Sequence, residues 1–179
     1  LSGASVAVTL GYLFNKDFGV INYYLGFLGI DNIPWLTSSD VVLFTIALTT
    51  VWRNLGFTFI IYLGGLSSMP GEVLEAAEVD GATGWRKFYR VILPLLSPTI
   101  LFAVVTDVIK MLQFFDEPFI MTRGGPGDSS RTVVMMMYES GFGNLDFGYG
   151  SAIALLLFAV IMIVTGIQFY LSRRWVFYG

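Results

Sequence analysis

The sequence has no cysteine and no histidine among its 179 residues. Disulfides, thiol nucleophiles, Cys/His zinc sites and catalytic pairs built on Ser-His or Cys-His are therefore excluded. Charged residues are scarce too, at 13%, whereas a soluble domain has about 25%. The formal net charge is −3, and no basic run indicates a nucleic-acid partner. We therefore predict no catalytic and no metal-binding residue in this chain.

Apolar residues dominate what is present. They make up 55% of the chain, and the mean hydropathy is +0.73, so lipid is the expected solvent for much of the surface. Because about 20 helical residues cross a hydrocarbon core of about 30 Å, the longer apolar segments predict spanning helices. The segments are 1–14, about 41–66, 97–121 and 151–171. The first is too short to span, so we expect it to be the end of a helix in a chain that lacks its N-terminal part.

The predicted fold class is accordingly all-α, a polytopic membrane helix bundle with one domain over residues 1–179. The loop 67–96 between the second and third segments holds three basic residues, and the C-terminal end holds two. Crossings at segments two, three and four put both regions on one side of the membrane, which the positive-inside rule makes cytoplasmic. The basic residues concerned are Arg86, Lys87, Arg90, Arg173 and Arg174.

The loop 67–96 has the pattern of a folded element. A short helix is predicted over 72–80, Gly81 ends it, and a second short helix over 83–91 carries Trp85 and Phe88 on one face. Pro94 and Pro98 are expected to set the entry into the third spanning helix. An amphipathic loop lying on the bilayer is the alternative. A docking element for a soluble protein fits better, because the first helix is acidic and lacks an apolar stripe. In it, Ala76 and Ala77 are expected to form a flat patch that another surface can approach.

Three parts of this loop carry a family resemblance. Glu75-Ala76-Ala77, Asp80-Gly81-Ala82 and Val91-Ile92-Leu93-Pro94 resemble the EAA loop of permease subunits in bacterial binding-protein-dependent ABC importers. The family pattern is Glu-Ala-Ala, three residues, Gly, nine residues, then Ile-x-Leu-Pro. The sequence departs from it only at Val91, which stands where the family has Ile.

Two outer segments extend the resemblance over essentially the whole chain. Phe14 to Gly19 and Thr122 to Gly127 are similar to outer loops of the carbohydrate branch, the second more like a MalF-like or glycerol-phosphate-type subunit than a MalG-like one. The resemblance implies a MetI-like permease core of six helices. This chain would hold the end of the third helix and all of the last three.

The resemblance implies a transport subunit rather than an enzyme. The chain would form part of the pathway for a sugar or sugar-derived solute, in a bacterial or archaeal cytoplasmic membrane, as a multi-pass protein. It would hold no cofactor itself, with ATP and Mg bound by a partner ATPase. The implied partners are a second permease, two ATPase subunits and an extracytoplasmic solute-binding protein. The residues implied in coupling to the ATPase are Glu75, Ala76, Ala77, Asp80, Gly81, Trp85, Arg86, Phe88, Leu93 and Pro94.

Polar residues inside the apolar segments are costly in lipid and normally face a cavity or a partner. Asp107 and Lys110 lie three residues apart on one helical face, so they either pair with each other or line a path for solute. In the family, the equivalent helices line the substrate site. Cations at Arg53 and Lys110 facing the pathway would favour an anionic solute such as a sugar phosphate. The pathway candidates are Arg53, Asn54, Phe57, Asp107, Lys110, Gln113 and Phe114.

Other functions remain open at this point. An importer permease for another solute class, such as amino acids or phosphate esters, would share the loop. A secondary transporter or channel that works without ATP explains the intramembrane charges but leaves the EAA loop unexplained. A non-transporting membrane scaffold explains neither feature.

Overall fold

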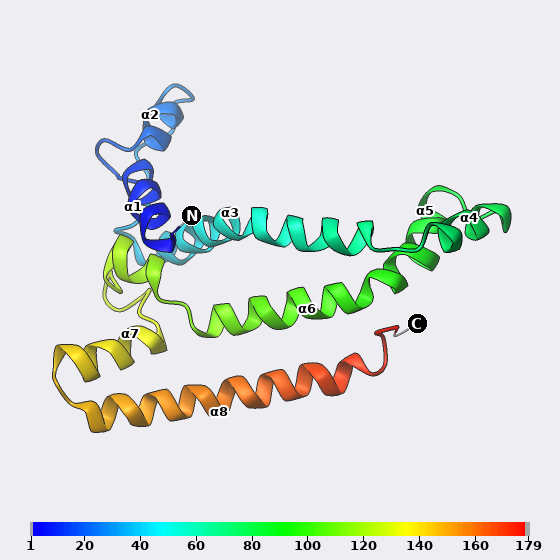
Figure 1. Ribbon diagram of the computed structural model, residues 1–179. Helices are drawn as coiled ribbons and strands as arrows, with labels where there is room; N and C mark the ends of the chain where they lie inside the picture. The colour runs from blue at the N-terminus through cyan, green and yellow to red at the C-terminus, as the bar shows by residue number, and fades with distance from the viewer. Residues whose placement is uncertain (1, 178–179) are drawn as a thin grey trace. The chain divides into compact units, whose positions relative to one another are not determined.

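The computed structural model describes residues 2–177, and every regular element within that range is a helix. The all-α class predicted from the sequence is confirmed. Figure 1 shows the order of the elements along the chain. They are α1 (Gly3–Leu13), α2 (Val20–Gly26), α3 (Ser39–Ser67), α4 (Gly71–Val79), α5 (Gly84–Lys87), η1 (Phe88–Ile92), α6 (Leu93–Leu112), η2 (Pro118–Thr122), α7 (Val133–Tyr138), η3 (Glu139–Gly143) and α8 (Phe147–Ser172).

Three helical stretches are long and apolar enough to cross a membrane. They are Ser39–Ser67, Gly84–Leu112 and Phe147–Ser172, where α5, η1 and α6 together form the second. Helix α1 is apolar but shorter. Most large side chains on these helices are exposed, as expected for surfaces whose solvent is lipid or another subunit.

The middle stretch begins earlier than the predicted 97–121. The predicted second loop helix continues directly into α6, so Pro94 and Pro98 lie inside the helical stretch rather than before it. Proline has no N–H to donate, and its ring clashes with the carbonyl four residues earlier in an α-helix. For Pro94 that carbonyl belongs to Arg90. The chain meets this constraint with the wider π turn of η1, immediately before α6.

Helix α6 also ends earlier than predicted, at Leu112 rather than Met121. Residues 113–115 are non-helical, so the pathway candidates Gln113 and Phe114 lie beyond the helix. Pro118 explains the break, because in a continuous α-helix its ring would clash with the carbonyl of Phe114. The chain turns and then starts η2 with Pro118 in its first turn, where a missing N–H costs nothing.

The chain divides into two compact units, the first comprising the residues up to Asn54 with Gln113–Phe158. In it, the buried Asn22 of α2 holds the segment between α1 and α3. Its amide nitrogen donates to Lys16 O and Ile33 O at 3.0 and 2.9 Å, and its oxygen accepts from the Trp35 Nε1–H at 2.8 Å. Thr45 of α3 donates to Trp35 O at 3.0 Å. A fully bonded amide of this kind fixes the loop on the end of α3.

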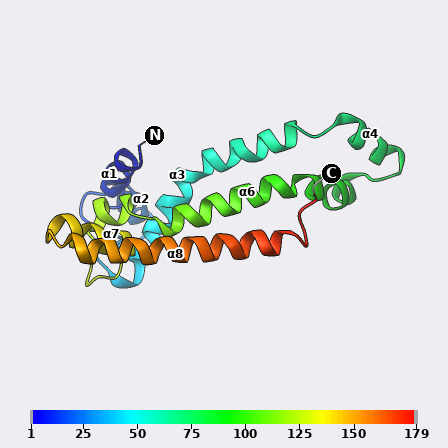
Figure 2. The same cartoon turned by 60° about the horizontal axis from the view of Figure 1, so that its bottom comes forward.

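The second unit comprises Leu55–Leu112 with the residues from Ala159 on. Within it, α6 lies between the C-terminal parts of α3 and α8 (Figures 1 and 2). The end of the chain returns to the start of α6, where the Phe177 N–H donates to Ser97 Oγ at 2.9 Å. Trp175 lines a groove with Tyr89 and Leu93 in the same region. This unit therefore contains both basic groups on which the predicted orientation rests.

Candidate functional site

The EAA segment folds as a short helix with a glycine turn. Helix α4 follows Pro70 and ends at Asp80, and the Ala82 N–H donates to Ala77 O at 2.8 Å. Gly81 has φ +77°, a left-handed conformation that side chains other than glycine adopt at a cost. A Cβ at Gly81 would meet nothing within 4 Å, so backbone conformation alone explains the glycine here.

Most of the predicted coupling residues are exposed. Glu75, Ala76, Asp80, Gly81, Trp85, Arg86 and Phe88 all lie on the surface, and Leu93 and Pro94 are partly covered. Ala77 differs, because it is only 9% exposed and its carbonyl closes the turn to Ala82. The expected patch of two alanines is therefore wrong: Ala76 faces outward and Ala77 packs inside the loop, because successive helical residues lie about 100° apart.

An aromatic cluster forms the second half of the loop. Trp85 stacks on Tyr89 with ring centroids 5.9 Å apart, and Phe88 packs edge-on against Trp85 at 5.9 Å and against Tyr89 at 5.2 Å. Trp85 is nevertheless 75% exposed. Sequence reasoning missed Tyr89, although its position four residues after Trp85 is the spacing of helical neighbours. A large exposed aromatic surface of this kind is typical of an interaction site.

An ion pair joins the two halves of the loop. Lys87 Nζ lies 2.7 Å from Glu78 Oε1, and the hydrogen bond to Lys87 lowers the pKa of Glu78 below its usual range. The sequence pattern does not predict this contact, since the two residues belong to different short helices. The pair fixes α5 against the end of α4.

Replacing Lys87 with methionine is expected to raise the pKa of Glu78 back toward the ordinary glutamate value. The lowered pKa means that the pair stabilises the loop above the ordinary glutamate pKa and loses this effect as the pH falls through the pKa of Glu78. Carboxyl ¹³C titration of glutamate-labelled protein measures the shift. An unchanged Glu78 titration in Lys87→Met would show that the pair does not form in solution.

Arg53, predicted as a pathway residue, lies in a charge cluster of the first unit. Its Nε is 2.8 Å from Glu117 Oε1, and its Nη1 is 4.0 Å from Asp116 Oδ2. Glu117 is fully buried, and neither of its carboxylate oxygens accepts a hydrogen bond from residues 2–177. A Cβ on Gly3 of α1 would overlap both Asp116 and Arg53. Helix α1, helix α3 and the segment just before η2 thus meet at one cation and two carboxylates.

The environment of Glu117 is unusual for a carboxylate. It follows the end of α6, outside the spanning stretches, and burial raises the pKa of Glu117 above its usual range, with Arg53 opposing the shift only in part. Sequence reasoning missed both acids, because nothing local links them to α3. The available signal was a pair of acids directly before a proline that breaks an apolar helix.

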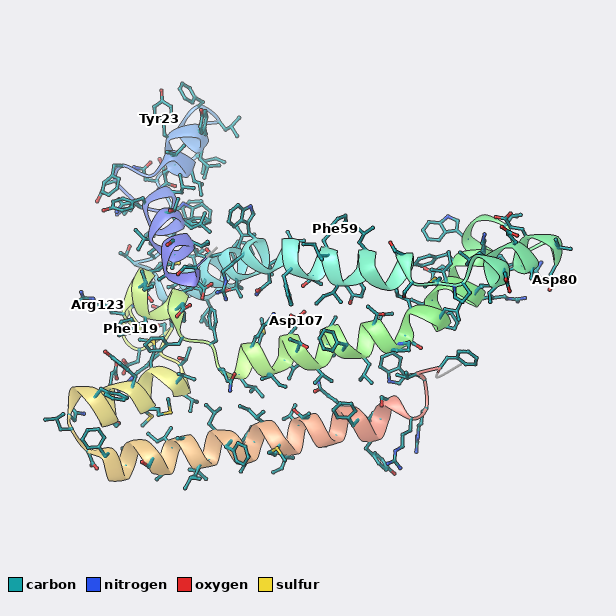
Figure 3. All side chains as sticks on the ribbon, viewed as in Figure 1. Tyr23, Phe59, Asp80, Asp107, Phe119 and Arg123 are labelled. Carbon is teal, nitrogen blue, oxygen red and sulfur yellow. The ribbon has the colours of Figure 1, made fainter. Side chains whose placement is uncertain are left out.

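Aromatic rings from the same stretch pack next to each other in the first unit. Phe115 stacks on Phe119 at 4.7 Å, and Tyr138 of α7 contacts the two rings at 5.4 and 5.3 Å. Figure 3 labels Phe119 in this unit. Of the other candidates there, Asn54 and Phe114 are partly buried and Gln113 is exposed. The polar and aromatic groups of this unit have the chemistry that hydroxyl-rich solutes require.

The remaining pathway candidates belong to the second unit. Lys110 Nζ is 4.0 Å from Asp107 Oδ1, three residues earlier on α6, and 4.0 Å from the centroid of the Phe57 ring of α3. Figure 3 shows Asp107 on α6. The pairing of Asp107 with Lys110, one of the two alternatives, is thus present.

Among residues 2–177 no group of three acids gathers as a metal site would require, and the absence of metal stays a prediction.

Comparison with known proteins gives the class of this chain. Residues 5–177 match the family described as "Binding-protein-dependent transport system inner membrane component", and the chain belongs to that family. The resemblance noted in the sequence is therefore confirmed.

Individual relatives come from the carbohydrate branch. The chain is 40% identical over 162 residues to the sulfoquinovosyl glycerol transport system permease protein SmoG of Agrobacterium fabrum, covering 90% of this chain and 53% of SmoG. It is 33% identical to the sn-glycerol-3-phosphate permease UgpA of the same organism, covering 94% and 57%. It is 32% identical to the trehalose/maltose permease MalF of Thermococcus litoralis, covering 93% and 56%. The chain thus spans little more than half the length of these relatives.

A solved structure gives the fold independently. A chain in the crystal structure of a bacterial ABC transporter involved in the import of alginate, an acidic polysaccharide, superposes with a TM-score of 0.86 at 24% sequence identity. The match covers 97% of this chain and 61% of that chain. The MetI-like permease fold predicted from the resemblance is confirmed.

Proposed function

We propose that this chain is a permease subunit of an ATP-driven importer of a sugar or sugar-derived solute. One observation carries the proposal: the EAA segment forms an exposed helix and glycine turn between two stretches long enough to span a membrane. The carbohydrate transport systems named for the relatives support the solute class. We place the chain in the cytoplasmic membrane of a bacterium or archaeon, crossing it several times.

The loop would receive mechanical work from an ATPase. The sequence has no Gly-rich phosphate loop of the Walker type, so ATP and Mg would be bound by two partner ATPase subunits. Glu75 on the exposed face of α4 would pair with a basic residue of the ATPase, and the Trp85 cluster would fill the joint. Closure of the ATPases would move the loop, and a second permease would complete the pathway.

A solute-binding protein outside the membrane would deliver the solute. A bacterial alginate ABC transporter that resembles this chain in fold was crystallised in complex with a periplasmic protein bound to an alginate pentasaccharide. That complex supports a partner of the same kind for this chain.

The ion pairs bear on the choice of solute. Arg53 is matched by Glu117 and Asp116 in one unit, and Lys110 by Asp107 in the other. Each cation that would attract an anionic solute therefore already faces a carboxylate. This balance supports a neutral, hydroxyl-rich solute over a sugar phosphate. Within the first unit, Arg53, Asn54 and Gln113 would bond its hydroxyls, and a ring face would pack on Phe114.

Charge reversal at Glu75 tests the coupling proposal. Glu75→Arg is expected to lower the ATPase recovered with the purified permease about ten-fold, since it replaces one charge-assisted hydrogen bond by repulsion. Glu72→Arg is the matched control, because Glu72 is exposed on the same helix but lies outside the motif. Equal recovery in wild type and Glu75→Arg, or equal losses in both variants, would contradict docking through the EAA segment. Failure to recover any ATPase with the wild-type permease would favour transport without ATP.

A further inference from the structure

A groove runs along one face of α8 near its C-terminal end. Gly166, Phe169, Tyr170 and Arg173 line it with the buried Ser172, and its volume is about 490 Å³. The first four recur at helical spacing, so they lie above one another on the same face. Gly166 forms the notch, since a Cβ there would meet nothing within 4 Å. Phe169 and Tyr170 are both exposed.

The groove is apolar along its length and ends at a cation. Helix α8 contains no charged residue, and Arg173 and Arg174 follow it directly. Neither arginine has an ion-pair partner anywhere in the part of the chain that the structure describes. From Gly166 to Arg173 the helix rises about 10 Å. Tyrosine and arginine at the end of an apolar helix mark the level of the lipid headgroups.

We propose that this groove is a binding site for one anionic phospholipid of the cytoplasmic leaflet. The phosphate would pair with the Arg173 guanidinium, and an acyl chain would lie in the notch at Gly166 against Phe169. Charge complementarity selects this occupant, because an arginine without an ion-pair partner among the described residues attracts a lipid of net negative charge more strongly than a zwitterionic one. A helix packed over the groove would instead bury an unpaired guanidinium at a high cost. The proposal requires that α8 spans the membrane with its C-terminal end on the cytoplasmic side, and does not depend on the solute or on ATP coupling.

Lipid retention tests the site in the intact complex. The complex is reconstituted in nanodiscs with equal amounts of phosphatidylglycerol and phosphatidylcholine, released, and analysed by native mass spectrometry. Wild type is expected to retain phosphatidylglycerol in preference to phosphatidylcholine. Arg173→Gln is expected to lower that retention about five-fold. Arg174→Gln, which removes the same charge one residue outside the groove, is expected to have a much smaller effect.

A second variant tests the contribution of the notch separately from that of the Arg173 charge. Gly166→Leu fills the notch without a clash inside this chain, so it is expected to fold normally and to lower lipid retention with Arg173 intact. Equal retention of the two lipids by wild type would overturn the proposal. So would equal losses in Arg173→Gln and Arg174→Gln, which would indicate surface attraction without a site. A third outcome would also overturn it. If wild type holds no lipid and Gly166→Leu releases the second permease from the complex, a protein covers the groove instead.

Discussion

Replacing Arg53 with methionine is expected to lower the free energy of unfolding by about 3 kcal/mol, near the lower end of the range for breaking a buried ion pair. The reason is Glu117, which is 0% exposed and has the Arg53 guanidinium at 2.8 Å. Without Arg53, a buried carboxylate either stays charged and unpaired or takes up a proton. The side chain of Arg53 is itself 26% exposed, which is why we expect the lower end of the range. Equilibrium unfolding in mixed micelles measures the loss.

Two comparisons make this expectation specific. Arg131→Met removes an ion pair with Glu139 in the same unit, but both side chains are 37% exposed, so its cost should be much smaller than that of Arg53→Met. Adding Glu117→Leu to Arg53→Met removes the orphaned carboxylate and should recover much of the loss. Equal costs for Arg53→Met and Arg131→Met, or no recovery in the double variant, would contradict a buried pair.

The pH dependence of the Arg53→Met variant follows from the same carboxylate. Burial already raises the pKa of Glu117, and removing the guanidinium raises it further. Since a raised pKa favours the protonated folded state, stability is lost as the pH rises through that pKa. The deficit of Arg53→Met relative to wild type should therefore shrink as the pH is lowered toward the ordinary glutamate pKa.

The second large effect is expected at Gly65, where α3 approaches α6. A Cβ there would lie 2.6 Å from Thr99 Oγ1, 2.8 Å from Thr99 Cγ2 and 2.9 Å from Leu96 Cδ1. Small residues let spanning helices approach this closely, and their side-chain packing is a main source of association in lipid. Gly65→Leu is expected to cost about 2–3 kcal/mol through overpacking, measured as thermal stability and yield of folded protein in detergent.

The neighbouring glycine provides the control. A Cβ at Gly64 would meet nothing within 4 Å, so Gly64→Leu keeps the same change of composition and helix propensity without the clash. Thr99→Ala removes both of the closest Thr99 atoms and should restore part of the stability that Gly65→Leu loses. Indistinguishable effects of leucine at positions 64 and 65 would show that α3 and α6 do not approach at Gly65.

The sequence alone predicts those features of the fold that depend on neighbouring residues and on the solvent. The apolar runs predict the spanning stretches because lipid requires about 20 apolar residues per crossing. The glycine turn at Gly81 was predictable because it depends on the backbone of Gly81 itself, whereas the coupling role of the loop is implied by its resemblance to the EAA loop. The break after α6 was also within reach, since Pro118 excludes a helix through Phe114 for a local steric reason.

What the tertiary structure alone decided is which distant groups meet. Arg53 was predicted as a pathway residue, and only the structure shows that it faces Glu117 and Asp116. Ala77 was expected on the surface beside Ala76, yet it packs inside the loop. Gly64 and Gly65 are equivalent in the sequence and differ only in which one faces Thr99. Such contacts depend on which face each helix turns toward its neighbour. The packing of distant side chains, and not the local sequence pattern, fixes the rotation of a helix about its axis.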